Sequence, residues 1–147
     1  MSQLVFVFGT LKEGFPNFAT NKGRKLPGAF ITQRRYPLYL VGDRHSPWLV
    51  DQQGDGEQVL GEVFEVDEQT LQAMDVLERT HEPDGYRRVM LPVEPVDGLL
   101  TAPVEVHAYL KRPAQLPLSE VRAGPLRDYT LAHAALYRPR GQEGVRE

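Results

Sequence analysis

The sequence predicts an α+β fold built on a curled, largely antiparallel sheet. Most of its apolar segments are short and rich in strand-forming residues, only two segments have helical periodicity, and turn signals separate several of the strands. The 147 residues, of which 41% are hydrophobic, are enough to bury one core. Because neither a repeat nor a long linker divides the chain, we expect a single domain over residues 1–139 and a polar, flexible tail over residues 140–147.

The first predicted strand covers residues 4–8, a continuous apolar run that is typical of a strand buried on both faces. Residues 29–41 are also rich in strand-forming types, and Pro37 among them indicates a bend or a sheet edge. Residues 48–51 and 59–66 flank the sequence QQGDGEQ, whose Gly-Asp-Gly is a hairpin turn signal. We therefore expect these last two strands to form a hairpin.

A second hairpin is predicted from residues 86–93 and 104–110, joined across the Asp97-Gly98 turn. In the second of these strands Val, Ala and Leu alternate with Glu105, His107 and Tyr109. Since successive side chains of a strand point to opposite faces, one face of this strand is expected to be buried and the other wetter.

Two segments have the period of a helix. In DEQTLQAMDVLER, Asp67 is a good N-cap, Glu68 suits the positive end of the helix dipole, and Pro83 limits the element on its C-terminal side. In PLRDYTLAHAALYRPR, a stripe at helical spacing ends before Pro139 and consists of Leu126, Tyr129, His133 and Tyr137. We expect one helix from each segment.

Composition and charge exclude several classes of function. The net charge of −3 gives no general attraction to nucleic acid, and the local basic clusters are interpreted as solvated surface charges. The chain has no cysteine, which excludes disulfides, thiolate nucleophiles and cysteine-based metal centres. The first apolar run is too short for a signal peptide or a membrane span, so we expect a cytoplasmic protein.

Glu78 is the first candidate for chemistry. It shares a helix face with Leu71 and Met74, which mark that face as the buried one, so its carboxylate is expected to point to the interior or a cleft. Burial and the negative end of the helix dipole both favour a general base that can later act as an acid. Asp75 is the rival carboxylate on this face; alternatively, Glu78 simply reaches water or pairs with a nearby arginine.

The second candidate is the turn that follows the first strand. Gly9 and Gly14 have the spacing of a P-loop, but Phe15-Pro16 stands where lysine and serine or threonine are needed, so we discount nucleotide binding. Gly9 still allows the backbone to approach a ligand closely. Consecutive N–H groups in such a turn bind anions such as carboxylates, although a glycine after a strand is also an ordinary junction.

The remaining candidates carry less information. Tyr86 and Arg88 share one strand face and either frame a ligand or pack and pair with Glu78 or Glu82. The histidines are scattered without the spacing of metal ligands, so no metal site is predicted.

Four segments taken together resemble a known family. FVFGTLKEGFPN is similar to the opening Tyr-Gly-Thr/Ser-Leu motif of the γ-glutamylcyclotransferase-like superfamily, and MDVLERTHEPDGYRRVMLPV is similar to its Asp-x-Phe-Glu…Tyr-x-Arg segment. RYPLYLVGDRHSPWLV and VLGEVFEVDEQTL resemble the γ-glutamylamine cyclotransferase branch. The resemblance runs over residues 4–93 and continues weakly beyond them.

This resemblance implies a small, partly closed, mostly antiparallel β-barrel with flanking helices, and an enzyme without metal or cofactor. It implies a small-molecule γ-glutamyl substrate whose α-amine attacks its own γ-carbonyl, releasing 5-oxoproline and an amine; it implies no nucleic acid, membrane or obligate protein partner. Glu78 takes the place of the catalytic glutamate. On the same match, the residues that take the place of the loop whose backbone N–H groups hold the substrate's α-carboxylate are Phe8, Gly9, Thr10 and Leu11.

The sequence departs from the family pattern at Phe8, where the motif has tyrosine, at Phe18, where relatives often have histidine, and at Leu77, where the motif has phenylalanine. A binding module of the same fold without turnover is therefore the alternative to an enzyme. Recognition of the amine half of the substrate is expected in the loops around residues 42–48 and after Glu78.

Overall fold

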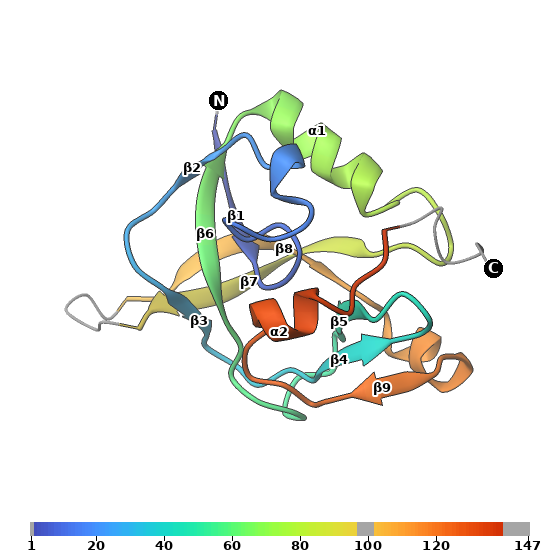
Figure 1. Cartoon of the computed structure of the whole chain (residues 1–147). Coiled ribbons are helices and arrows are strands. Elements are labelled where there is room, and N and C mark those ends of the chain that lie inside the picture. Colours follow the sequence, from blue (N-terminus) through green and yellow to red (C-terminus); the bar gives the residue numbers. More distant parts are fainter. Residues whose placement is uncertain (1, 97–101, 140–147) are drawn as a thin grey trace.

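The computed structural model describes residues 2–96 and 102–139, and its centre is a closed five-stranded barrel (Figure 1). The barrel closes because β1 pairs on one side with β6, antiparallel, and on the other with β8, parallel. The remaining neighbours are antiparallel, which confirms the predicted α+β class and mostly antiparallel barrel. The barrel strands are β1 (Gln3–Val7), β3 (Phe30–Thr32), β6 (Leu60–Val66), β7 (Arg87–Pro95) and β8 (Val104–Leu110), and β2 (Arg24–Lys25) extends the sheet beside β6.

Helices and a second sheet flank the barrel. In Figure 1, α1 (Glu68–Leu77) lies above the barrel, while β4 (Leu38–Val41), β5 (Ser46–Leu49) and β9 (Val121–Ala123) form a separate three-stranded sheet at the lower right. The short helix α2 (Leu131–Ala134) lies beside that sheet. The described residues also form two short 3-10 helices, η1 (Phe18–Thr20) and η2 (Pro113–Leu118).

The sequence prediction for α1 is confirmed down to its cap. The Asp67 carboxylate accepts a hydrogen bond from the Thr70 amide at 2.8 Å, and this bond lowers the pKa of Asp67. The buried face consists of Thr70, Leu71 and Met74. The helix ends at Leu77, so the next residue is its C-cap.

The predicted hairpin between residues 48–51 and 59–66 is wrong. β5 pairs with β4 and β6 pairs in the barrel, so the two segments belong to different sheets. The glycine-rich turn between them packs closely against the backbone of Tyr36. A side chain at Gly56 would not fit there, since a Cβ would overlap the Tyr36 carbonyl oxygen. The predicted strand over residues 29–41 is divided into β3 and β4, and residues 33–37, which include the predicted bend at Pro37, lie between them. Turn residues indicate a change of direction but not the partner of the next strand.

The predicted helix in residues 125–140 is reduced to the four residues of α2. The segment before it is held by strand-like backbone bonds, from the Leu126 amide to the Leu38 carbonyl and from the Leu60 amide to the Arg127 carbonyl. Tertiary pairing therefore takes the backbone groups that a longer helix needs. The predicted stripe residue Tyr129 is nevertheless fully buried.

The pairing of β7 with β8 is confirmed over seven residue pairs, from Arg87 opposite Leu110 to Val93 opposite Val104. The predicted Asp97-Gly98 turn and the predicted tail over residues 140–147 lie outside the described residues. The single domain over residues 1–139 stays a prediction.

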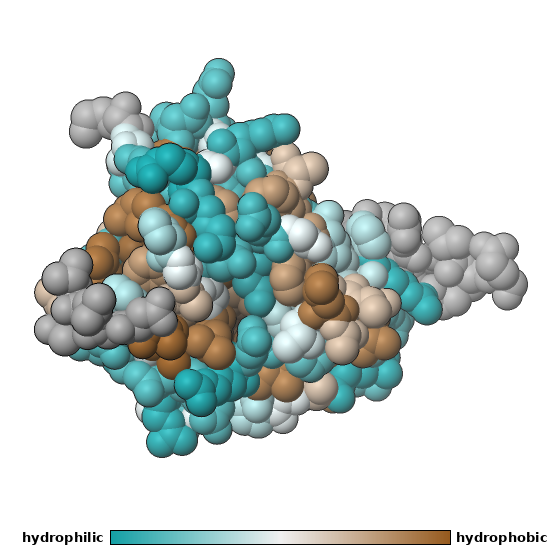
Figure 2. All heavy atoms as spheres, turned by 60° about the vertical axis from the view of Figure 1, so that its left-hand side comes forward, coloured by the Kyte–Doolittle hydropathy of each residue, from teal (hydrophilic) through white to brown (hydrophobic). Residues whose placement is uncertain are grey.

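The core fills the barrel and extends beneath α1. Its largest fully buried side chains include Phe6, Phe64, Tyr36, Tyr109 and Tyr129. Figure 2, which turns the left-hand side of Figure 1 forward, shows brown apolar side chains gathered in patches among polar ones. Across the described parts of the chain, no helix has the length and hydropathy to cross a membrane.

Candidate active site

A pocket of about 180 Å³ opens where the loop after β1, the end of α1, the β4–β5 turn and the C-terminal segment meet. Six of the seven residues that the sequence analysis selected line it: Phe8, Gly9, Thr10, Leu11, Glu78 and Tyr86. Segments almost seventy residues apart are therefore brought to one cavity. Arg88 is not among the lining residues.

The loop after β1 is folded so that three successive amides donate to no acceptor among the described residues. The Gly9 carbonyl accepts from the Lys12 amide at 3.1 Å, and the Thr10 carbonyl accepts from the Asn17 amide at 2.8 Å. The Asn17 side chain also donates to the Thr10 hydroxyl at 2.8 Å. Within residues 2–96 and 102–139, the N–H groups of Gly9, Thr10 and Leu11 have no hydrogen-bond acceptor. Successive backbone N–H groups of this kind can donate hydrogen bonds to a bound anion.

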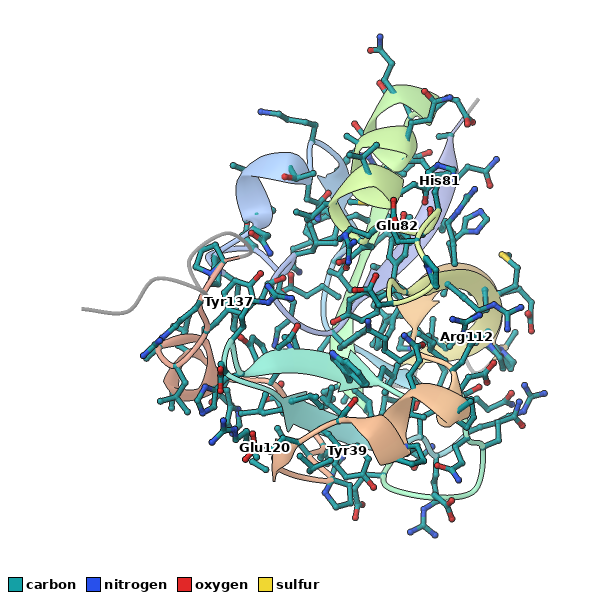
Figure 3. All side chains as sticks on the ribbon, turned by 90° about the vertical axis from the view of Figure 1, so that its right-hand side faces the viewer. Tyr39, His81, Glu82, Arg112, Glu120 and Tyr137 are labelled. Carbon is teal, nitrogen blue, oxygen red and sulfur yellow. The ribbon has the colours of Figure 1, made fainter. Side chains whose placement is uncertain are left out.

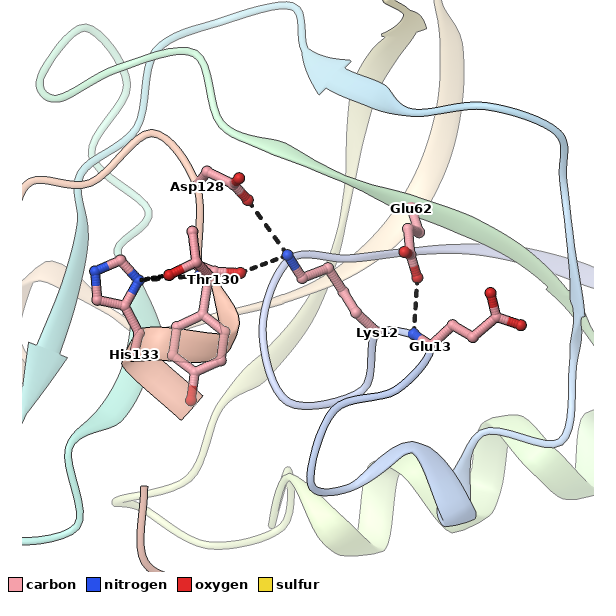
Figure 4. Close-up of polar contacts among 7 residues, drawn as sticks. Lys12, Glu13, Glu62, Asp128, Thr130 and His133 are labelled. Atoms are coloured by element: carbon pink, nitrogen blue, oxygen red, sulfur yellow. Dashed lines mark hydrogen bonds and ion pairs between the residues drawn. The ribbon is translucent and has the colours of Figure 1, made fainter. Parts of the chain in front are cut away.

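Lys12 ties this loop to the C-terminal part of the chain (Figure 4). Although charged, it is only 7% exposed, and its Nζ donates to the Tyr129 carbonyl at 2.5 Å and lies 3.3 Å from the Asp128 carboxylate. Beside it, the Glu13 amide donates to the Glu62 carboxylate at 2.9 Å. A buried ammonium with these partners fixes the loop position, since losing them would leave its charge uncompensated.

Gly9 lies against the β4–β5 turn. A Cβ built on Gly9 would be 2.8 Å from Pro47 Cγ, closer than carbon atoms normally approach. The φ angle of Gly9 is outside the left-handed region, so the requirement for glycine here is one of space. The close approach joins the loop to the wall of the pocket that Pro47 forms.

Glu78 is held at the C-terminus of α1 by its own backbone. Its amide donates to the Met74 carbonyl at 2.9 Å, and its carbonyl accepts from the Tyr86 amide at 3.0 Å. The turn between them is tight, because a Cβ at Gly85 would lie 1.8 Å from the Arg79 carbonyl oxygen. The side chain is half-buried and lines the pocket.

Tyr86 also lines the pocket. Its hydroxyl donates to the Pro47 carbonyl at 2.7 Å and lies 3.3 Å from the Ser46 hydroxyl. Burial, and then the negative charge of Glu78, raise the pKa of Tyr86, so its hydroxyl keeps its proton at neutral pH. Lys111, which is 3% exposed, stands 4.4 Å from the centre of the Tyr86 ring.

Tyr109 also lines the pocket, and it connects Asp75 and Arg88 to it. The Tyr109 hydroxyl donates to Asp75 Oδ1 at 2.7 Å, and Arg88 Nε lies 3.2 Å from the same oxygen. Burial, then the hydrogen bond to Asp75, raise the pKa of Tyr109, and the charge of Glu78 adds to this effect. Asp75, the rival carboxylate, is not a lining residue, and Arg88 pairs with it rather than with Glu78 or Glu82. Direct binding of substrate by Arg88 stays a prediction.

Sequence reasoning did not select five polar residues of the pocket, namely Asn17, Arg44, Ser46, Tyr109 and Tyr137. Asn17 Nδ2 lies 3.2 Å from the Tyr137 hydroxyl, and Arg44 Nη1 lies 3.4 Å from the same oxygen. Figure 3 shows Tyr137 on one side of the molecule and His81 and Glu82, just after α1, on the other. No spacing rule joins these residues, because the fold alone brings the C-terminal segment to the loop.

A larger groove, of about 620 Å³, adjoins the pocket and shares Arg44 and Ser46 with it. Part of its lining comes from residues 41–48 and from Pro83 and Asp84 after Glu78, which are the two loops that the sequence analysis associated with the amine half of a substrate. The rest comes from a segment that the sequence analysis did not select, namely Lys111, Gln115, Ser119 and Glu120. Over the described ranges, no three His, Asp or Glu side chains are grouped as metal ligands.

Comparison with known proteins gives a consistent set of relatives. The family model described as gamma-glutamyl cyclotransferase, AIG2-like, matches residues 5–131. Gamma-glutamylaminecyclotransferase of Bos taurus is 37% identical over 143 residues, which cover 92% of this chain and 82% of the bovine protein. Gamma-glutamylaminecyclotransferase B of Danio rerio is 38% identical over 100 residues, which cover 65% of this chain but only about half, 51%, of that relative. The crystal structure of an AIG2-like protein from Mus musculus has a TM-score of 0.75 and 30% identity, covering 95% of this chain and 97% of the mouse chain.

Proposed function

Since the chain belongs to the gamma-glutamyl cyclotransferase, AIG2-like family, we propose that it is an enzyme that converts γ-glutamyl amines to 5-oxoproline and the free amine. One observation carries the proposal: a half-buried glutamate lines the same pocket as three residues whose amides have no acceptor within residues 2–96 and 102–139. The names of the bovine and zebrafish relatives support an amine, rather than an amino acid linked through its α-nitrogen, as the second half of the substrate.

The amides of Gly9, Thr10 and Leu11 are proposed to bind the α-carboxylate of the glutamyl half. An α-carboxylate is a small anion, and hydrogen bonds from backbone N–H groups to a charged acceptor are stronger than those between neutral groups. Holding the carboxylate at this point turns the α-amine toward the γ-carbonyl, four bonds away. Ring closure then requires little further ordering, because both reacting groups are already in one molecule and in one conformation.

Glu78 is proposed to move the protons. The α-nitrogen enters as an ammonium, gives one proton to Glu78 and attacks the carbon of the γ-carbonyl group. Glu78 passes this proton to the nitrogen of the amine half and then takes the second proton, which the α-nitrogen gives up as the ring forms. The bond from the carbonyl carbon to the amine nitrogen then breaks. Because an amine is a poor leaving group, that nitrogen takes the two protons and leaves as an ammonium, and Glu78 returns to a carboxylate. Electrons and protons balance without any other reactant.

Tyr86 and Tyr109 are proposed to shape the pocket around the substrate. Both keep their protons at neutral pH because their pKa values are raised, and both hydroxyls already donate to protein oxygens, of Pro47 and Asp75 respectively. Neither is therefore suited to act as a base. The reaction is assigned to the cytoplasm and to a small-molecule substrate, and it involves no metal, cofactor, nucleic acid or protein partner.

The test is release of 5-oxoproline from Nε-(γ-glutamyl)lysine by the purified protein, followed by chromatography. Glu78→Gln keeps the size of the side chain but cannot accept a proton, and we expect kcat to fall by about 10²- to 10⁴-fold. Glu82→Gln removes an exposed carboxylate four residues further on and serves as the matched control, with activity close to that of the parent.

Full activity of Glu78→Gln, with its fold intact by circular dichroism, would contradict the role of Glu78. If the parent protein releases no 5-oxoproline but binds Nε-(γ-glutamyl)lysine in calorimetry, the chain is a binding module of the same fold instead of an enzyme.

A further inference from the structure

Of the charged residues that the structure describes, only Lys12 and Lys111 are buried, with 7% and 3% of their surface exposed. Neither lines the pocket, and each contacts a segment that carries one half of the candidate site. We propose that Lys111 is a positioning residue that holds Glu78 and Tyr86 for proton transfer, and that Lys12 does the same for the loop of Gly9–Leu11 that binds the substrate. This inference rests on the proposed function and concerns residues that act through their neighbours.

Lys111 is held on two sides, by its backbone and by two aromatic rings. Its amide donates to the Leu49 carbonyl at 2.8 Å, and its carbonyl accepts from the Asp51 amide at 2.9 Å. Its Nζ lies 4.3 Å from the centre of the Trp48 ring and 4.4 Å from the centre of the Tyr86 ring, within the range of cation–π contacts. The position of the ammonium is therefore fixed by the second sheet and by the pocket residue Tyr86.

The ammonium of Lys111 also reaches the turn that joins Glu78 to Tyr86. It donates to the Asp84 carbonyl at 2.6 Å, and the Tyr86 amide donates to the Glu78 carbonyl at 3.0 Å. One cation thus contacts both the backbone of this turn and the ring that follows it. Because the Glu78 backbone is bound to the same turn, a shift of the turn changes where the Glu78 carboxylate lies in the pocket.

Lys12 holds the other half of the site in a similar way (Figure 4). Its Nζ donates to the Tyr129 carbonyl at 2.5 Å and lies 4.4 Å from the centre of the Phe15 ring. Its amide donates to the Gly9 carbonyl at 3.1 Å. Each buried ammonium therefore binds a backbone carbonyl and an aromatic face, and the two are joined to different walls of the pocket.

The two lysines are expected to affect catalysis more than stability. Burying an ammonium costs free energy, and an apolar side chain of similar volume is often at least as stable in such a place. What the charge adds is a fixed position for the groups that it contacts.

The two halves of the site act on different kinetic constants. The α-carboxylate of the substrate keeps its charge throughout the reaction, so contacts with it act on binding. Glu78 changes its protonation only as the reaction proceeds, so its position acts on kcat. The proposal therefore predicts that the two lysines separate KM from kcat.

Lys12→Met and Lys111→Met keep the apolar stem of lysine and remove the ammonium. For 5-oxoproline release from Nε-(γ-glutamyl)lysine, we expect Lys12→Met to raise KM by about 10- to 100-fold and to change kcat by less than about threefold. We expect Lys111→Met to lower kcat by about 10- to 100-fold and to change KM by less than about threefold. Lys22→Met, which removes an exposed ammonium, is the matched control and should change neither constant.

Binding is also measured directly, by calorimetry with Nε-(γ-glutamyl)lysine in a Glu78→Gln background that slows turnover. The affinity should fall with Lys12→Met and stay close to that of the background with Lys111→Met. Thermal unfolding of each variant checks that the fold is kept.

A chemical rescue separates the charge of Lys111 from its volume. Because the chain has no cysteine, Lys111→Cys can be alkylated at a single thiol. In denaturant, the thiolate displaces bromide from 2-bromoethylamine, which restores an ammonium at the length of lysine, or from 1-bromopropane, which gives an uncharged side chain of the same size. After refolding, we expect the aminoethyl form to recover most of the lost kcat and the propyl form to recover none. The emission of Trp48, the single tryptophan of the chain, checks that the ammonium is again beside its ring.

The outcomes are distinct. A higher KM in Lys111→Met would show that Lys111 binds substrate directly, and equal recovery by the aminoethyl and propyl forms would show that it only fills space. Parallel changes of kcat and KM in both variants, or a failure of Lys111→Met to fold, would show that the lysines support the fold alone; each of these results overturns the proposal. If the parent protein releases no 5-oxoproline, the proposed function itself fails, and the positioning roles fail with it.

Discussion

Substitution of Gly9 by alanine tests whether the close approach of the loop to the β4–β5 turn controls the pocket. The new Cβ would lie 2.8 Å from Pro47 Cγ and 3.2 Å from Pro47 Cβ. Carbon atoms in contact are usually about 3.5–4.0 Å apart, so the loop or Pro47 must move by roughly 0.7 Å or more. Both residues line the pocket, and the Pro47 carbonyl accepts the Tyr86 hydroxyl, so the movement changes two walls at once.

The size of the effect follows from this overlap. Overpacking of this kind usually costs about 1–3 kcal/mol, which for a chain of this length lowers Tm by about 3–10 °C. A misplacement approaching 1 Å at a site that positions a substrate can reduce the rate by up to about 10²-fold. We therefore expect Gly9→Ala to lower kcat/KM for Nε-(γ-glutamyl)lysine by about 10- to 100-fold.

The assay is 5-oxoproline release together with thermal unfolding, on the single variants and on the pair. Leu11→Met is the matched control: Leu11 is buried in the same loop, but the change conserves volume and should cost less than about 1.5 kcal/mol. Pro47→Ala removes the Cγ that the new Cβ meets, so Gly9→Ala combined with Pro47→Ala should recover part of both losses. Unchanged activity and Tm in Gly9→Ala, or equal losses in Gly9→Ala and Leu11→Met, would refute the reasoning.

Two further predictions concern Arg88 and His107, which both interact with the charge of Asp75. Arg88→Met removes the ion-pair partner of Asp75 but leaves its hydrogen bond from Tyr109. Because Arg88 lines no part of the pocket, we expect kcat/KM to fall by less than about fivefold; a rise of KM above about tenfold would show direct binding of substrate. Burial, and then the charge of Arg88, lower the pKa of His107 below 6.5. The imidazole of the unfolded chain therefore binds a proton more readily than that of the folded chain. His107 thus contributes stability that is present above pH 6.5 and is lost as the pH falls through its folded pKa. Thermal unfolding at pH 7 and pH 5 should therefore show a smaller loss of Tm for His107→Gln than for the parent, and equal losses would contradict this assignment.

Local patterns were sufficient for much of the fold because they depend on neighbouring residues alone. The cap at Asp67, the buried face of α1 and the pairing of β7 with β8 follow from side-chain chemistry and periodicity within short segments. The predicted hairpin between residues 48–51 and 59–66 failed for the opposite reason. Its glycines mark a change of direction, but the strands with which β5 and β6 pair depend on surfaces that distant segments supply.

The two halves of the candidate site, Glu78 on an apolar helix face and the glycine turn after the first strand, can be selected from short stretches of sequence. That they line one pocket, that Asp75 is held by Tyr109 and Arg88, and that Arg44 lines both the pocket and the groove follow from the folded chain alone. The physical reason is that helical and strand periods act over a few residues. A pocket between the loop after β1, the β4–β5 turn and the C-terminal segment exists only once the closed barrel has fixed these segments relative to one another.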